Sequence, residues 1–298
     1  MRVVVKTPAS SANLGPGFDV LGLALGLYDT LSIESGTEGI KLTVSGEGQG
    51  KLEKQPEKNL ACRSVKAFYQ RLDKPLPPVN IHMDNKIPLS RGLGSSSAAI
   101  VGALTAANYF SGAGMSKEDL FHLAVEIEGH ADNVAAAVYG GLVIAYKEKE
   151  KFQVKKCRVA SNLGSVVLVP KAGLSTAKAR AALPEKIERE AAVFNIGRVA
   201  LLTEALLTGE LSHLSIAVED ALHQPWRRSL ISDYQATSDV CYRAGAKGVA
   251  LSGAGPTLIA FFDKAEQDAI DSKLKHELSL AKIDRQALFL KVDEEGSN

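Results

Sequence analysis

The sequence predicts an α+β protein with two lobes. Segments with strand-like and helix-like patterns mix along its 298 residues, without the regular repeat that an all-parallel sheet would need. A chain of this length suits two domains or one domain with two lobes, and it can bury a sizeable core. The charged run KEKEK at 147–151 is the best candidate for the boundary, which predicts a first lobe at 1–150 and a second at 151–298. A solvated hairpin tip would explain the same run, so that interpretation stays open.

Hydrophobic periodicity places the elements. Strands are expected where apolar residues alternate or form short runs, at 2–6, 40–44, 79–87, 142–146, 165–170, 248–253, 257–262 and 287–292. Helices are expected where they recur at helical spacing, at 61–72, 96–110 and 120–127, in several segments between 176 and 245, and at 265–277. The segment 96–110 is apolar nearly all round, which predicts a buried helix. Ser116 and Asp119 have the spacing of a capping box, and the glycines at 140–141 are expected to end a short helix.

Composition narrows the class of protein. Apolar residues make up 45% and charged residues 23%, as in soluble globular proteins. The net charge of +1 gives no reason to expect a nucleic-acid or anionic-membrane partner. Cys62, Cys157 and Cys241 form no C-x-x-C pair, which favours reduced thiols in a cytosolic protein. The start MRVVVKTPASS lacks a signal-peptide core and the longest apolar stretch is too short to span a bilayer, so we expect a cytoplasmic protein.

The stretch PLSRGLGSSSAA at 88–99 raises the question of function. Its glycines and serines would bring backbone N–H groups and hydroxyls to a helix N-terminus, where negative charge is favoured. No Lys follows the glycines, which excludes a Walker A loop, and Ser97 stands where the dinucleotide fingerprint needs its third glycine. Taken alone, the stretch fits a phosphate cradle and a glycine turn with a serine N-cap equally well. The candidate nucleotide-binding residues here are Pro88, Leu89, Ser90, Arg91, Gly92, Leu93, Gly94, Ser95, Ser96, Ser97 and Ala98.

Two further stretches identify a family. PASSANLGPGFDVLGLAL at 8–25 and GVALSGAGPTLIAFF at 248–262, together with P-x-x-x-G-L-G-S-S, resemble the three signature motifs of the GHMP kinases over nearly the whole chain. The runs ANLGPGFD, EGHADNVAAAVYGG, STAKARAALP and HQPWRRSLI are most similar to the homoserine kinases of that family. The resemblance implies a ribosomal-protein-S5-like first lobe that binds ATP and a ferredoxin-like second lobe that completes the substrate site. It also implies ATP-dependent phosphorylation of the side-chain hydroxyl of L-homoserine, a step of threonine biosynthesis.

The resemblance further implies a partner for each charge of this small zwitterion. The implied substrate residues are Asn13, Asp19, His130, Asn133, Arg180 and Arg227. The two arginines would hold the carboxylate, because a guanidinium fork matches it, and Asp19 with Asn13 would accept from the ammonium. Taken singly, each has a structural alternative: a turn or helix cap for the Asn and Asp, a helix-end contact for the His, and a surface position for the arginines. Arg228 could exchange roles with Arg227.

The resemblance also implies Mg²⁺, with the carboxylate of Glu126 and the hydroxyl of Ser96 as its protein ligands. A Glu among apolar residues is costly unless it is paired, which suits a metal. The run from Glu126 to His130 is shorter than in some family members, so Glu128 is the second choice, and either Glu could instead face water. The sequence leaves open which serine of 95–97 meets the metal.

The expected reaction uses no protein base. The resemblance implies that Asn133 stands where mevalonate-type and galactose-type relatives have an Asp as general base, and Asn cannot take a proton. The hydroxyl would therefore attack a loose, metaphosphate-like phosphoryl group and lose its proton late. Asp132 would be the base if the register slipped by one residue. The candidate catalytic residues are Ser96, Glu126, Asp132 and Asn133.

The nucleotide base is less well specified. Asn59 resembles the start of the segment that lines the adenine pocket, and Lys86 could reach a phosphate or lie exposed at a strand end. The alternatives to a homoserine kinase are another small-alcohol kinase such as mevalonate kinase, a non-catalytic ligand sensor and an RNA-binding protein. The two arginines and Asp19 argue against another small alcohol as substrate. The retained metal residues argue against a sensor, and the near-neutral charge argues against RNA binding. We expect L-homoserine and ATP as partners, with no nucleic acid and no membrane, and a homodimer stays open.

Overall fold

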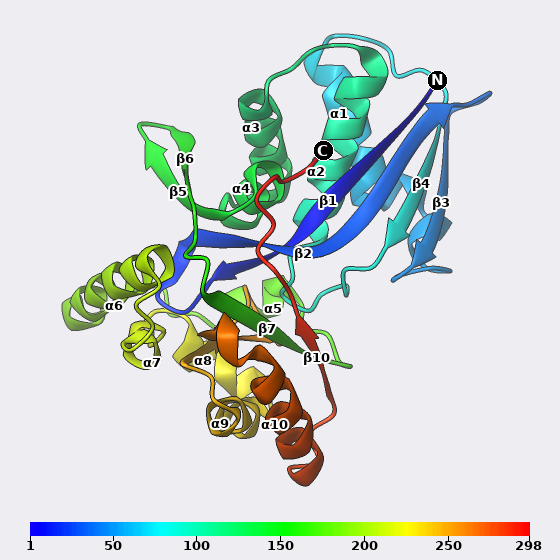
Figure 1. Cartoon of the computed structure of the whole chain (residues 1–298). Coiled ribbons are helices and arrows are strands. Elements are labelled where there is room, and N and C mark those ends of the chain that lie inside the picture. The colour runs from blue at the N-terminus through cyan, green and yellow to red at the C-terminus, as the bar shows by residue number, and fades with distance from the viewer.

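The computed structural model describes residues 1–298, the side chain of Glu53 excepted. Two lobes lie end to end, each built on its own sheet (Figure 1). Their mixture of largely antiparallel sheets and helices confirms the predicted α+β class.

The first sheet has the strand order β3-β4-β2-β5-β6, and β1 pairs with β2 alongside this path. Its strands are β1 (Arg2–Asn13), β2 (Gly17–Ser35), β3 (Ile40–Gly46), β4 (Val79–Asn85), β5 (Leu142–Glu148) and β6 (Lys151–Cys157). β3 and β4 run parallel, and the other pairs in this sheet are antiparallel. The long β2 pairs with β4 near its end and with β5 near its beginning, so it links the two parts of the sheet.

Helices cover one face of this sheet (Figure 1). They are α1 (Leu60–Arg71), α2 (Ser95–Ser111), α3 (Lys117–Glu128) and α4 (Asp132–Tyr139), after two short 3₁₀ turns at Leu52–Lys54 and Pro56–Lys58. α2 is buried along most of its length, as its apolar pattern predicted. The capping box at Ser116 and Asp119 forms as expected, and Gly140 ends α4.

The second sheet has the order β10-β7-β9-β8 and is antiparallel. Its strands are β7 (Leu163–Pro170), β8 (Gly248–Leu251), β9 (Leu258–Asp263) and β10 (Arg285–Phe289). Alternate residues of β7 face opposite ways: Val166 and Leu168 pack with α9 and α10, whereas Val167 and Val169 belong to a core shared with the first lobe. This shared core fixes how the lobes meet.

The remaining helices lie in the second lobe. They are α5 (Thr176–Ala181), α6 (Arg189–Thr208), α7 (Leu214–Ala217), α8 (Gln224–Arg227), α9 (Tyr234–Ala244) and α10 (Gln267–Leu280), with 3₁₀ turns at Arg228–Leu230 and Lys264–Glu266. α6 is long and apolar enough to cross a membrane, although only 22% of the apolar window is buried. Length and composition alone do not separate such a helix from one of a soluble protein.

The charged run at 147–151 forms the tip of the hairpin between β5 and β6, which was the alternative interpretation. Because β6 still belongs to the first sheet, the boundary expected at residue 150 falls inside a hairpin of the first lobe. We propose that the chain changes lobe between Cys157 and Leu163. It returns at its end, where the C-terminal segment runs back beside the first lobe (Figure 1) and Ser297 donates to the carbonyl of Ala137.

Candidate active site

The glycine-rich loop lies at the start of α2. Gly94 has a φ of +68° and precedes Ser95, the first residue of the helix. Gly92 has a φ of +74°, and a Cβ there would lie 2.2 Å from the backbone oxygen of Ser252. Both positions therefore require glycine, for backbone conformation and for close approach. The loop presents the N-terminus of a buried helix to the space beside it, as a phosphate cradle requires.

The third motif ties this loop to the first motif. The Ser252 hydroxyl donates to the Gly92 carbonyl at 2.6 Å, and the Gly253 amide donates to the Ala12 carbonyl at 2.9 Å. Asn13 donates from Nδ2 to the Gly253 carbonyl at 2.9 Å. Three segments that are far apart in the sequence thus meet at one point between the lobes.

Not every residue of the loop faces its ligand space. The guanidinium of Arg91 donates to backbone carbonyls of Leu89, Pro170 and Lys171, so its charge points to the second lobe. Leu93 and Ala98 pack in the core that the lobes share. They support the loop from behind.

The structure brings Glu128 to the loop and leaves Glu126 outside it. Glu128 Oε1 accepts hydrogen bonds from the hydroxyls of Ser96 and Ser97, and its side chain is 7% exposed. Glu126 is 58% exposed and pairs with Arg71 on the surface. Two residues apart on a helix, the two side chains point to opposite sides, so Glu126 does not reach Ser96. Glu128, the second choice from the sequence, has the position that a metal ligand needs.

The protein supplies only some of the ligands that a Mg²⁺ ion needs. Among the described residues, no group of three or more His, Cys, Asp and Glu side chains could hold a metal. A carboxylate and a hydroxyl are nevertheless what Mg²⁺ takes from a protein when nucleotide phosphates and waters supply the rest. Ser97 is fully buried, whereas Ser96 lines the hollow beside the loop, which favours Ser96 as the hydroxyl ligand.

His130 lies between two carboxylates. Its Nδ1 is 3.0 Å from Asp132 Oδ1 and its Nε2 is 3.5 Å from Glu128 Oε1. Burial lowers the pKa of His130, but the hydrogen bond and charge of Asp132 and the charge of Glu128 outweigh it, so the pKa is raised overall. The imidazole, which lines the site, is therefore protonated more readily than an ordinary histidine.

Asn133 and Asp132 differ in what they can contact. Asn133 Oδ1 accepts from the Ser10 hydroxyl at 2.9 Å, and the residue lines the hollow beside the glycine loop. Asp132 is buried, and its Oδ1 takes hydrogen bonds from the backbone amide and side chain of Asn133 as well as its contact with His130. Asp132 thus orients its neighbours.

Asp19 and Arg180 join the lobes. Arg180 donates from both terminal nitrogens to the two oxygens of Asp19, each at 3.0 Å, and this hydrogen bond raises the pKa of Arg180. Asp19 has a φ of +56°, and its amide donates to Asn13 Oδ1 at 2.9 Å. The amide of Asn13 is therefore occupied at both ends: it shapes the loop that carries Asp19.

Arg227 is buried behind this pair. It is 2% exposed, and both Arg180 and Arg227 lie within 6 Å of the Phe18 ring. In the described part of the chain, no carboxylate lies within ion-pair distance of Arg227. Burial, and then the charge of Arg180, lowers the pKa of Arg227, yet a guanidinium stays charged. Arg228, the alternative, instead lies over the ring of Tyr234.

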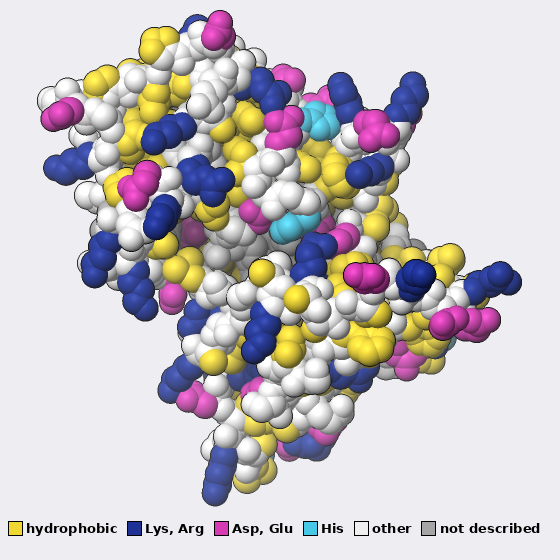
Figure 2. All heavy atoms as spheres, turned by 180° about the vertical axis from the view of Figure 1, so that it is seen from behind, with side chains coloured by type: hydrophobic (Ala, Val, Ile, Leu, Met, Phe, Trp, Pro, Cys, Tyr) yellow, Lys and Arg dark blue, Asp and Glu magenta, His cyan; other side chains and the backbone are white. Residues whose placement is uncertain are grey.

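Adjoining hollows run along the loop. One of about 250 Å³ is lined by Leu52, Asn59, Leu60, Met83, Leu89 and Ala99, and it suits a nucleotide base. Asn59 also caps α1, because its Oδ1 accepts from the amides of Ala61 and Cys62. A second hollow contains the loop with Glu128, His130 and Asn133, and a third contains Ser96, Glu128, His130 and Arg180. All three include Ser96, and Figure 2 shows His, basic and acidic side chains gathered at the waist between the lobes.

Sequence reasoning missed residues that the fold brings to this site. Thr176 lines both the loop hollow and the hollow beside Arg180. Asp29 lines the nucleotide hollow, and its Oδ1 accepts from the amides of Lys86 and Ile87, which lead into the loop. Burial is the main cause that raises the pKa of Asp29 to about 6. The Lys86 side chain is exposed. Asp29 stands in none of the quoted motifs, whereas Thr176 stands in the run STAKARAALP, where only Arg180 was singled out.

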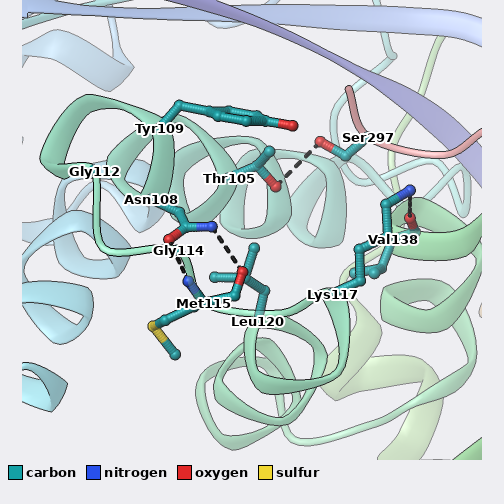
Figure 3. A pocket seen from close by; sticks show the side chains of 10 residues that line it. All are labelled: Thr105, Asn108, Tyr109, Gly112, Gly114, Met115, Lys117, Leu120, Val138 and Ser297. Carbon is teal, nitrogen blue, oxygen red and sulfur yellow. Dashed lines mark hydrogen bonds between the residues drawn. The ribbon is translucent and has the colours of Figure 1, made fainter.

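A separate cavity of about 340 Å³ lies at the far end of α2 (Figure 3). Thr105, Asn108, Lys117 and Ser297 line it among apolar side chains. Their polar groups bond one another or nearby backbone, as the dashed lines in Figure 3 show for Asn108 with Met115. None of the residues predicted for the active site lines this cavity.

Comparison with known proteins gives the family. Residues 59–141 match the model of the GHMP kinases N terminal domain, and residues 202–280 match that of the GHMP kinases C terminal. The chain belongs to the GHMP kinases. A homoserine kinase of Moorella thermoacetica is 43% identical over 87% of this chain and 86% of its own length. One of Caldicellulosiruptor bescii is 40% identical over 99% of this chain and 96% of its own.

Solved structures agree with this GHMP kinase in fold. The crystal structure of a homoserine kinase from Cytophaga hutchinsonii matches with a TM-score of 0.89 and 30% identity, covering 100% of this chain and 96% of that one. The resemblance carried by the three motifs is therefore confirmed, together with the two-lobed fold that it implied.

Proposed function

We propose that this GHMP kinase transfers the γ-phosphoryl group of ATP to the side-chain hydroxyl of L-homoserine. Its relatives named homoserine kinase, at 43% and 40% identity, support this substrate. The structural observation that carries the proposal is Arg227, a buried guanidinium without a carboxylate partner among the described residues. A buried cation of this kind calls for an anion, and a carboxylate fits a guanidinium fork.

The pair of Asp19 and Arg180 explains how a zwitterion would be recognised. The ammonium of homoserine would take Asp19 as its partner, and its carboxylate would take Arg180 and Arg227. Binding would thus exchange one ion pair for three contacts between opposite charges, so that every charged group of the site and of the substrate has a partner. A mevalonate, which has no ammonium, would break the Asp19–Arg180 pair without replacing the partner of Asp19.

The phosphate side of the reaction is assigned to the glycine loop. The backbone of Gly92–Ser96 would hold the phosphates at the helix N-terminus, in place of the lysine of other nucleotide loops. Glu128 and Ser96 would hold Mg²⁺, which when bound neutralises the charge of the phosphates. The Asn59 side of the loop would take the adenine.

We infer that no side chain removes the hydroxyl proton. The hydroxyl oxygen bonds to the γ-phosphorus while the bond to the leaving ADP breaks, and the proton passes late to an oxygen of the transferred phosphoryl group. Asn133 cannot accept it, and Asp132 already holds His130 and Asn133. An Asp132→Asn enzyme that retains near-normal turnover supports this mechanism, and one that loses several orders of magnitude contradicts it. The proposal places the reaction in the cytoplasm.

One assay tests the substrate. Formation of ADP is followed with ATP, Mg²⁺ and, in turn, L-homoserine, mevalonate, galactose and L-serine. We expect turnover with homoserine alone at low concentration. Turnover of another alcohol without turnover of homoserine would refute the proposal.

A further inference from the structure

His223 lies directly behind Arg227 and is fully buried. Its Nδ1 is 3.2 Å from Arg227 Nη1, and its Nε2 is 2.7 Å from the carbonyl oxygen of Gly15. Its ring stacks on Phe18 with centroids 5.2 Å apart, on the ring that also faces both arginines. The imidazole therefore connects the first motif to a guanidinium of the second lobe.

The partners on either side determine the protonation of this ring. A carbonyl only accepts, so Nε2 must carry the hydrogen, and a guanidinium only donates, so Nδ1 must be bare. Burial is the largest cause that lowers the pKa of His223, which keeps the ring neutral. The groups that face it include Asp220, whose charge favours protonation, and Arg227, whose charge opposes it.

A second set of bonds fixes where the ring stands. Asp220 is buried and accepts from the amides of His223 at 2.8 Å and Gln224 at 2.6 Å. Asn195 of α6 donates to Asp220 at 2.8 Å and to the carbonyl of Pro16 at 3.0 Å. The backbone that carries His223 is thereby tied to the same loop that its Nε2 contacts.

We propose that His223 is a positioning residue, which through its bare Nδ1 holds the guanidinium of Arg227 in the orientation that receives the substrate carboxylate. This inference rests on the proposed function, because it takes the carboxylate of homoserine as the ligand of Arg227. Arg227 also donates to the carbonyls of Ala179 at 3.4 Å and Gly253 at 3.3 Å. Among the described residues, the imidazole at 3.2 Å is the side chain that accepts a hydrogen bond from its guanidinium.

Two substitutions separate the two contacts of the ring. In His223→Asn, the amide oxygen takes the place of Nδ1 and can still accept from Arg227, while the bond to Gly15 is lost. In His223→Gln, the longer amide takes the place of Nε2 and can still donate to Gly15, while the bond to Arg227 is lost. His276→Gln, on the exposed surface of α10, is the matched control.

Steady-state kinetics and melting temperature are measured for all three. We expect His223→Gln to raise the KM for homoserine about 10- to 100-fold, the range for a lost hydrogen bond to a charged group, with kcat and the KM for ATP nearly unchanged. We expect His223→Asn to keep the KM for homoserine near that of the wild type. Equal rises in both variants, or a larger rise in His223→Asn, would overturn the proposal, because the ring would then act through Gly15 and the loop.

A measurement without substrate keeps this test apart from that of the proposed function. In ¹⁵N spectra of the wild-type enzyme, we expect the His223 ring to show hydrogen at Nε2 alone between pH 6 and 8. We also expect an Arg227 side-chain signal protected from exchange in the wild type and in His223→Asn. A doubly protonated or Nδ1–H ring, or the same protection of Arg227 in His223→Gln, would contradict the positioning role whatever the substrate is.

Discussion

Replacement of Glu128 by Gln is the sharpest test of the proposed metal site. Gln has the same shape and keeps an oxygen that can accept from the hydroxyls of Ser96 and Ser97, so the change removes a charge and little else. Each of these hydrogen bonds weakens by about 1 kcal/mol when its acceptor becomes neutral. The neutral amide also avoids the cost of burying a charge, which offsets part of this loss. We therefore expect the free energy of unfolding to fall by less than about 2 kcal/mol.

The effect on catalysis should be much larger. Loss of one preorganised charged group at a phosphoryl-transfer site costs about 10²- to 10³-fold in rate, or about 3–4 kcal/mol. We therefore expect kcat/KM of Glu128→Gln to fall by that factor, with a higher Mg²⁺ concentration needed for half-maximal rate. A coupled ADP assay across a Mg²⁺ titration measures both quantities.

Glu126→Gln is the matched control, since it makes the same change two residues away on the same helix. Its surface pair with Arg71 is worth at most about 1 kcal/mol, so rate and stability should stay near those of the wild type. If Glu126→Gln loses activity and Glu128→Gln keeps it, the assignment from geometry is wrong. If Glu128→Gln lowers only the melting temperature, Glu128 is a structural partner of the serines.

Three other outcomes follow from the structure. Gly92→Ala should impair ATP binding and stability more than Gly112→Ala does. Both glycines have a positive φ, but only at position 92 would the new Cβ lie against a backbone oxygen, at 2.2 Å. Equal thermal shifts and equal KM values for ATP in the two variants would contradict the close approach. Arg285→Met should lower the free energy of unfolding, measured in urea, by about 3 kcal/mol. Arg285 is buried and donates to Asp233 and to the carbonyls of Leu168 and Pro256. A loss below about 1 kcal/mol would show that these carbonyls find other donors. His130 has a raised pKa, so its contribution to stability is fully present below about pH 6.5 and is lost as pH rises through the raised value. The difference in free energy of unfolding between the wild type and His130→Gln should therefore shrink over that range. A difference that widens as pH rises would contradict the direction of this pKa shift.

Local patterns predicted much of the fold. The strands at 40–44 and 79–87 alternate because one face of their sheet is buried, and the helix at 96–110 is apolar all round because other elements enclose it. The segment at 287–292 was expected as one strand, but β10 ends at Phe289, and Val292 forms only an isolated bridge to Leu25 as the chain crosses back to the first lobe. Periodicity reports apolar residues but not which sheet they join.

The candidate site divides in the same way. The sequence by itself determined the family, the glycine loop and its two companion motifs, because those depend on backbone conformations that few residues allow. It also supplied the residues that we propose for both charges of the substrate. It placed Glu126 before Glu128 as the metal ligand. Both stand in the same helical run, and only the packing of α3 against α2 decides which one faces the loop.

Only the tertiary structure decided the partners. Asp19 pairs with Arg180 across 161 positions of the sequence. Arg227 contacts His223, which in turn contacts Gly15 in the loop after β1. No local pattern marks a buried arginine, because its burial is made favourable by groups that the fold brings from elsewhere. The sequence determines which residue types are present. Their burial, their contacts and the tautomer of His223 depend on how the two lobes pack against each other.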